Sequence, residues 1–205
     1  MRIVCVSDTH SQHDSIVVPD GDILVHAGDF SKRGRRAEIE AFDGWLGSLP
    51  HAHKVVIAGN HDFALEQDPD ARNWIQNAIY LQDSGAAVAG LQFWGSPWQP
   101  RFYDWAFNLD RGPLLREVWS RIPSNLDVLL THGPPRGILD KTDRREPVGC
   151  DDLLEAVLLK RPRLHVFGHI HEAYGRVERG GTTFVNACSC NLDYRPIQAP
   201  IVVDL

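Results

Sequence analysis

Five short polar clusters in this chain contain the residue types that bind metal ions. They are Asp8-Thr9-His10, Gly28-Asp29, Gly59-Asn60-His61-Asp62, Thr131-His132-Gly133 and Gly168-His169-Ile170-His171. Each cluster follows a short apolar run, which places it just past the end of an expected β-strand. Because ligands bind beyond the carboxyl ends of the strands in α/β sheets, the five clusters are predicted to meet in one place.

The side chains in these clusters suit hard or borderline divalent cations. Carboxylate, imidazole and amide oxygen bind manganese, iron or zinc, and no cysteine belongs to the set. One carboxylate can bridge two ions, and seven candidate ligands are present: Asp8, His10, Asp29, Asn60, His132, His169 and His171. A purely structural role for so many clustered polar groups is disfavoured, because burying them without a cation would be costly. The glycines beside the clusters are expected to allow tight turns at the strand ends.

The apolar runs predict the elements that position these ligands. They are too short for helices and rich in β-branched residues, which indicates strands buried on both faces. The expected strands are Ile3–Val6, Ile23–Ala27, Val55–Ala58, Val128–Leu130, Leu164–Phe167, Thr182–Val185 and Ile201–Val203, with a hairpin inside Leu81–Trp94 around Gly90. Apolar residues spaced by three and four predict helices over Ala37–Leu46, Leu114–Ile122 and Asp151–Lys160, the last capped by Asp151 or Asp152. The residues Ser96–Gly112 are expected to form a long ordered loop. The alternation indicates an α/β protein with mixed sheets.

Length and composition exclude several classes of protein. The 205 residues fit a single domain, 1–205, that buries a substantial core. The formal net charge of −6 disfavours a protein that tracks a nucleic-acid backbone. No apolar stretch approaches the ~20 residues of a membrane span, and no signal peptide is expected before the first strand. With only four cysteines, a cytoplasmic location is expected. The sequence does not decide between a monomer and a homo-oligomer.

The order of the clusters resembles a known family. DxH, GD, GNHD, H and GHxH, from Val6 to His171, resemble the signature of calcineurin-like metallophosphoesterases. Ser7–His10, Ile57–His61 and Thr131–Pro135 are further similar to the animal metallophosphoesterase-domain (MPPED) proteins, which are class III cyclic nucleotide phosphodiesterases. Some of those proteins carry glycine where this chain has His169. The complete GHxH motif therefore predicts stronger metal binding and fuller activity in this chain.

The resemblance implies a fold and a ligand assignment. The fold is a pair of mixed β-sheets packed face to face with helices outside. Two divalent ions are implied, manganese first, with iron and zinc as alternatives. Asp8, His10 and His171 would hold the first ion, Asn60, His132 and His169 the second, and Asp29 would bridge them.

The mechanistic hypothesis is attack by a metal-bridging hydroxide on a small phosphodiester or nucleotide, with cyclic nucleotides as the favoured substrates. His61 is expected to protonate the leaving group, and Asp62 to orient His61. Asn60, His61 and Arg136 are expected to contact the substrate. The alternatives are a phosphomonoesterase or phosphoprotein phosphatase, a metal-binding scaffold without catalysis, and a nuclease, which the acidic balance disfavours.

Several other polar and aromatic residues allow two interpretations. The aromatic segment 93–107 is interpreted as packing under a loop, or as a wall on which a nucleobase stacks. The basic runs Lys32-Arg33 and Arg144-Arg145 are interpreted as solvated faces, with phosphate steering as the alternative. His13, His51 and His53 are expected on the surface or in loops. His26 and His165 are expected in the core or behind the ligands.

Overall fold

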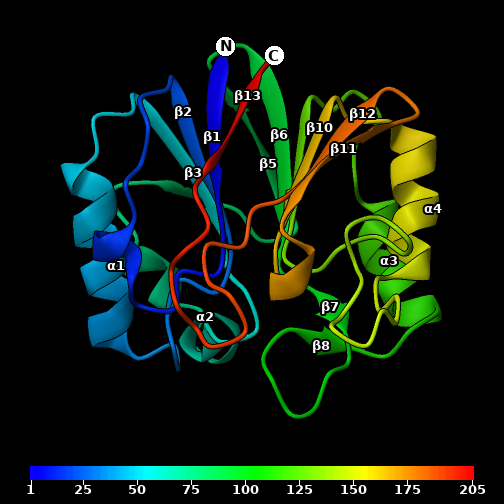
Figure 1. The fold of residues 1–205 in the computed structure, drawn as a ribbon, viewed down its shortest axis with the longest axis horizontal. Helices are drawn as coiled ribbons and strands as arrows, with labels where there is room; N and C mark the ends of the chain where they lie inside the picture. The colour runs from blue at the N-terminus through cyan, green and yellow to red at the C-terminus, as the bar shows by residue number, and fades with distance from the viewer.

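Two mixed β-sheets pack face to face in the computed structural model, which describes residues 1–205 (Figure 1). The first sheet has the order β13 (Ile201–Asp204), β1 (Arg2–Val6), β2 (Ile23–Ala27), β3 (His53–Ile57) and β4 (Ile79–Tyr80). The second has the order β11 (Gly175–Arg179), β12 (Thr182–Asn186), β10 (Leu164–Phe167), β9 (Val128–Thr131), β6 (Leu91–Ser96) and β5 (Ser84–Val88). All the expected strands are present, including the hairpin of β5 and β6, and the predicted fold class is confirmed.

Helices cover the outer faces of the sandwich. Figure 1 shows α1 (Arg36–Ser48) outside the first sheet, and α3 (Pro113–Ser120) and α4 (Asp151–Lys160) outside the second. The short helix α2 (Phe63–Gln67) follows β3, and single 3₁₀ turns span His13–Ser15, Ala71–Trp74 and His171–Ala173. No helix combines the length and apolarity that a bilayer crossing requires. The expected cap of α4 is wrong: Cys150 is the N-cap, and its Sγ accepts a hydrogen bond from the Leu153 N–H at 3.4 Å.

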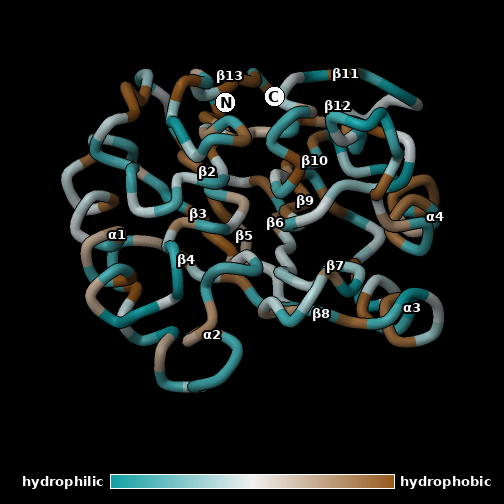
Figure 2. Tube along the Cα trace, turned by 60° about the horizontal axis from the view of Figure 1, so that its bottom comes forward, coloured by the Kyte–Doolittle hydropathy of each residue, from teal (hydrophilic) through white to brown (hydrophobic).

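The strands are buried on both faces because successive side chains point to opposite sides of a sheet. Ile3 and Cys5 belong to the core between the sheets, whereas Val4 and Val6 pack with Phe42 of α1. A third core lies between the second sheet and the helices α3 and α4. Figure 2 shows the corresponding hydrophobic stretches along the strands between the helices. The continuous apolar runs in the sequence are a consequence of this double burial.

Parallel pairing brings the functional strand ends to one edge. Strands β1, β2 and β3 are mutually parallel, as are β6, β9, β10 and β12. The two sheets also point the same way, because an isolated parallel bridge joins Ser7, after β1, to Cys188, after β12. Their carboxyl ends lie at the bottom of Figure 1.

The segment Ser96–Gly112 is only partly the loop that was expected. It contains the short parallel strands β7 (Gln99–Pro100) and β8 (Asn108–Leu109). The Gln99 N–H donates to the Phe107 carbonyl at 3.0 Å, and the Arg101 N–H to Leu109 at 2.9 Å. This ribbon holds the intervening aromatic residues beside the strand ends.

Candidate metal centre

The ends of five strands bring the candidate ligands together. Asp8 and His10 follow β1, Asp29 follows β2, Asn60 follows β3, His132 follows β9, and His169 and His171 follow β10. All but His169 are buried. Asp8 and Asp29 take part in groups of possible metal donors whose atoms lie within 4.8 Å of one another. Two of these groups contain only carboxylates and imidazoles, whereas the third joins Asp8 and His171 with the Cys188 thiol, which was not expected in the set.

The first group of donors surrounds Asp8. His171 Nε2 lies 3.3 Å from Asp8 Oδ1 and 3.3 Å from His10 Nε2. His10 Nε2 is 3.9 Å from the same Asp8 oxygen. The ring of His171 is fixed from behind, because its Nδ1 is 2.9 Å from the Asn191 carbonyl and donates to it. The Nε2 atoms of His10 and His171 therefore face the carboxylate.

The second group surrounds His132. Its Nε2 lies 2.9 Å from Asn60 Oδ1, and its Nδ1 donates to the Ala27 carbonyl at 2.9 Å. The ring of His169 lies beside it, with centroids 5.1 Å apart. A hydrogen-bonded Nδ1 fixes the tautomer that leaves Nε2 as the donor atom for a cation.

Asp29 connects the two groups. Its Oδ2 is 3.9 Å from His10 Nε2 in the first group and 3.5 Å from His132 Nε2 in the second. Its Oδ1 accepts the His61 backbone N–H at 2.8 Å, which leaves Oδ2 to face both groups.

Burial and neighbouring charge set the protonation of the centre. Burial favours neutral His132, but the Asp29 carboxylate outweighs it and raises the pKa of His132 to about 9. The hydrogen bond to Asp8 likewise overcomes burial and raises the pKa of His171 to about 9. Burial raises the pKa of Asp8 and Asp29, yet the neighbouring histidines outweigh it and lower both values. Burial lowers the pKa of His10 to about 4 and that of His169 to about 3.

The donor set fits divalent cations. Two buried carboxylates converge with imidazoles and one amide oxygen, and their only ion-pair partners are histidines. Divalent cations would replace the protons of His132 and His171 as the positive charge beside these carboxylates, and would satisfy the converging oxygen and nitrogen atoms.

Four of the candidate ligands have strained backbones. Asp8, His10, Asp29 and His169 have φ values of +52°, +44°, +56° and +67°. The left-handed region costs a non-glycine residue of order 1–3 kcal/mol when it is held there at a functional site. All four strained residues direct their side chains toward the centre, and the surrounding structure must stabilise these conformations.

The glycines beside the ligands allow tight turns, as expected, and also allow a close approach between loops, which was not expected. Gly28 has φ +98°, which is the anticipated turn conformation. Gly168 has no positive φ, but a Cβ at this position would overlap Asp8 Oδ2 and Ser7 Oγ. Close approach of the β10 loop to Asp8 therefore requires glycine.

Ser7 and Cys188, which the sequence did not single out, hold the far oxygen of Asp8. Asp8 Oδ2 accepts Ser7 Oγ–H at 2.6 Å, Cys188 Sγ–H at 3.2 Å and the His169 N–H at 3.0 Å. Burial and the adjacent Asp8 raise the pKa of Cys188, which keeps it a thiol and a donor. The His169 N–H also reaches Asp8 Oδ1 at 3.2 Å, and this is the oxygen that faces the imidazoles of His10 and His171.

The expected role of Asp62 is wrong. Its carboxylate accepts no hydrogen bond from the His61 ring; it accepts the backbone N–H groups of Asp29, Ser31 and Gly59 at 2.8–3.0 Å and the Ser31 hydroxyl at 2.6 Å. Asp62 thereby ties the loops after β2 and β3 together. The Lys32 carbonyl orients His61 instead, accepting from Nδ1 at 2.9 Å.

His61 stands between the two groups and the solvent. Its Nε2 is 3.8 Å from Asp29 Oδ2, and its side chain is 12% exposed. Its ring packs against Trp105 with centroids 4.2 Å apart. It can therefore touch both the centre and a bound ligand.

A cavity of about 430 Å³ opens over the centre and reaches both groups, since Asp29, His169 and His171 are among its lining residues. Asn60, His61 and His169 lie in its wall, and Phe102, Trp105 and Tyr194 give it an aromatic side. In the segment 93–107, Phe93, Trp94 and Phe107 are core residues, as the packing interpretation expected, whereas Phe102 and Trp105 line the cavity. Stacking of a nucleobase on this wall stays a prediction. Tyr194 belongs to the connection between β12 and β13, and nothing in the sequence pointed to it.

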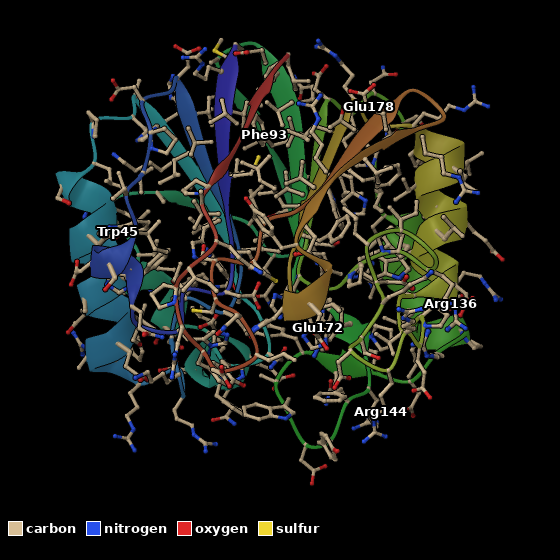
Figure 3. All side chains as sticks on the ribbon, in the orientation of Figure 1. Trp45, Phe93, Arg136, Arg144, Glu172 and Glu178 are labelled. Carbon is tan, nitrogen blue, oxygen red and sulfur yellow. The ribbon has the colours of Figure 1, made fainter.

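Arg136, which was expected to contact the substrate, does not line this cavity. Figure 3 shows Arg136 on the side of α3 and α4, away from Glu172 in the cavity wall. The arginines that line the cavity are Arg101 and Arg111. Arg136 is directed elsewhere by the turn after Pro135, where its N–H donates to the Cys150 carbonyl.

Two of the remaining histidines, His13 and His51, are more buried than expected. His13 and His51 are each only 3% exposed; His13 packs on Phe42 and Trp45, and His51 Nε2 donates to the Pro19 carbonyl at 3.0 Å. His53 is exposed, as predicted. His26 and His165 were expected in the core or behind the ligands, and both are fully buried in strands of the core.

Comparison with known proteins agrees with this geometry. The profile of the calcineurin-like phosphoesterase family matches residues 1–173. The chain is 47% identical to human metallophosphoesterase domain-containing protein 1 over 230 residues, covering 100% of this chain and 71% of the human one. One crystal structure superposes with a TM-score of 0.69 at 17% identity, covering 90% of this chain and 89% of the other. A Thermus thermophilus structure gives 0.60 at 13% identity, covering 90% and 88%. The chain therefore belongs to the calcineurin-like phosphoesterases and is a metal-dependent hydrolase of phosphate esters.

Proposed function

We propose that this protein is a two-metal phosphodiesterase acting on small diesters, with nucleotides, cyclic nucleotides among them, as its substrate class. Asp8, His10 and His171 would hold one ion, and Asn60, His132 and His169 the other, with manganese as the expected metal. The position of Asp29 Oδ2 carries the proposal, because it lies within 3.9 Å of a donor in each group.

When bound, the metals would supply a nucleophile from water near neutral pH and neutralise charge on the phosphoryl oxygens. The protein supplies position and a proton. Because Nδ1 of His61 donates to Lys32, Nε2 is the ring nitrogen that faces the centre. A proton held there can pass to the departing oxygen. Asp62 acts indirectly, by fixing the loops that carry Asp29 and Asn60.

The size and lining of the cavity support small substrates. About 430 Å³ accommodates a nucleotide-sized molecule and lies within the range of small-molecule sites. Trp105 and Tyr194 offer aromatic faces for a base, and base stacking is worth roughly 1–3 kcal/mol. Arg111 also lines the cavity, but its guanidinium is engaged by the Gly149 and Val148 carbonyls.

A substrate panel tests the proposal. Metal-stripped protein reloaded with manganese, iron or zinc is assayed on bis-p-nitrophenyl phosphate, p-nitrophenyl phosphate, cyclic AMP, cyclic GMP and single-stranded DNA. We expect metal-dependent cleavage of the small diesters in preference to the monoester and DNA. Faster turnover of the monoester would replace the proposal by a phosphomonoesterase. Binding of two ions without any turnover by folded protein would replace it by a scaffold.

Metal binding should release protons. A histidine must lose its proton to bind a cation, and the pKa values of about 9 mean that His132 and His171 are protonated at pH 7.5 in the metal-free protein. Manganese binding should therefore release about two protons, and affinity should rise with pH up to about 9 and then level off. Calorimetric titration in two weakly coordinating buffers with different ionisation enthalpies measures the release. Identical heats in both buffers would contradict the assigned ligands.

A further inference from the structure

A second compartment adjoins the metal centre on the side of His61. It is an open depression of about 410 Å³, lined by His10, Gln12, Lys32, Arg33, His61, Trp105 and Tyr194. Three of these residues, His61, Trp105 and Tyr194, also line the first cavity. The two spaces therefore meet at the residue proposed to protonate the leaving group.

The second compartment is basic in an acidic protein. Its lining contains two cations and no carboxylate, although the chain has a formal net charge of −6. Neither Lys32 nor Arg33 forms an ion pair; the Arg33 guanidinium lies over the Trp105 ring at 5.7 Å. In the first cavity, by contrast, Arg101 is paired with Asp110 at 2.6 Å and Arg111 lies 3.4 Å from Asp151. Unneutralised positive charge is therefore concentrated beside His61, where it attracts anions.

The loop that carries these cations is tied to the centre. The Lys32 carbonyl accepts from His61 Nδ1 at 2.9 Å, and the adjacent Ser31 is bound through its N–H and hydroxyl to Asp62. The Gly34 N–H donates to Ser31 Oγ at 2.9 Å. The backbone of Lys32 and Arg33 is thus fixed relative to the centre, while both side chains reach solvent.

We propose that this compartment binds a second phosphate of the substrate, attached on the leaving-group side of the scissile phosphorus. The preferred substrate is then a linear phosphodiester with a terminal phosphate. A cyclic mononucleotide has one phosphate and leaves this compartment unused. The inference rests on the proposed phosphodiesterase function and specifies which small diesters it favours.

Thymidine dinucleotides with no terminal phosphate, a 5′-terminal phosphate or a 3′-terminal phosphate provide the test. We expect the manganese-loaded wild type to hydrolyse one of the two phosphorylated forms with a kcat/KM at least about tenfold above the unphosphorylated form, the factor expected of one charge-assisted contact. In the double variant Lys32→Ala/Arg33→Ala this preference should disappear, mainly through KM. The matched control Arg179→Ala removes an exposed cation at the hairpin end of β11 and should keep the preference.

The outcomes separate this inference from the function on which it rests. Equal kcat/KM for all three dinucleotides would overturn the second subsite and leave the phosphodiesterase intact. A preference that survives in the double variant would also overturn it. Failure to hydrolyse any dinucleotide or bis-p-nitrophenyl phosphate would instead overturn the proposed function.

Discussion

Replacing His169 by glycine should lower kcat/KM for bis-p-nitrophenyl phosphate more than about 100-fold, because residues that only orient metal ligands are already worth 10–100-fold. Bound manganese should fall from two ions per chain to about one, since the ring beside His132 supplies the only imidazole besides His132 in the second group. Metal analysis and kinetics on stripped and reloaded protein measure both effects.

The backbone at His169 makes this variant a clean test. Its φ is +67°, a conformation that glycine adopts without strain. Relief of strain offsets the extra entropy that glycine brings to the unfolded chain, so the melting temperature of the metal-free variant should stay within about 4 °C of wild type. His53→Gly, at the exposed start of β3, is the matched control and should keep full activity. Two bound ions and normal turnover in His169→Gly would remove His169 from the ligand set.

The fold was predictable because its strands are buried on both faces. Ile23–Ala27 and Leu164–Phe167 have the predicted bounds, since a doubly buried strand is almost entirely apolar, with His26 and His165 as the exceptions here, and a polar cluster follows each strand at once. The same property located the candidate ligands, which occupy the first positions past these strands. Strands such as β11 escaped prediction because the exposed residues Arg176–Arg179 carry no such pattern.

Side-chain direction and long-range contacts were not predictable. Asp62 follows His61 directly, but the loop conformation sends its carboxylate to Asp29, Ser31 and Gly59. Arg136 follows the His132 motif, but the turn after Pro135 carries it away from the cavity. Cys188 reaches Asp8 across a sequence separation of 180 residues, which only the pairing of the sheets establishes.

Removing the imidazole of His61 should slow turnover in proportion to the basicity of the leaving group. General acid catalysis contributes typically 10²–10⁴-fold, and this contribution matters most for a basic alkoxide or phenolate. His61→Ala should therefore lose about that factor on cyclic AMP and on diphenyl phosphate, and much less on bis-p-nitrophenyl phosphate. Metal content should remain near that of wild type, because the His61 backbone N–H still donates to Asp29 Oδ1.

Asp62→Asn is the matched comparison, since it separates protonation of the leaving group from support of the loops. An amide cannot accept from all four donors that the carboxylate satisfies, so the loops after β2 and β3 should loosen. Metal affinity and melting temperature should fall, and turnover of all three substrates should decline by a similar factor. If His61→Ala behaves in that uniform way and loses metal, His61 supports the centre rather than protonating the leaving group. If Asp62→Asn instead slows the substrates in proportion to leaving-group basicity, the assignment of Asp62 to loop support is wrong, and Asp62 assists protonation by His61.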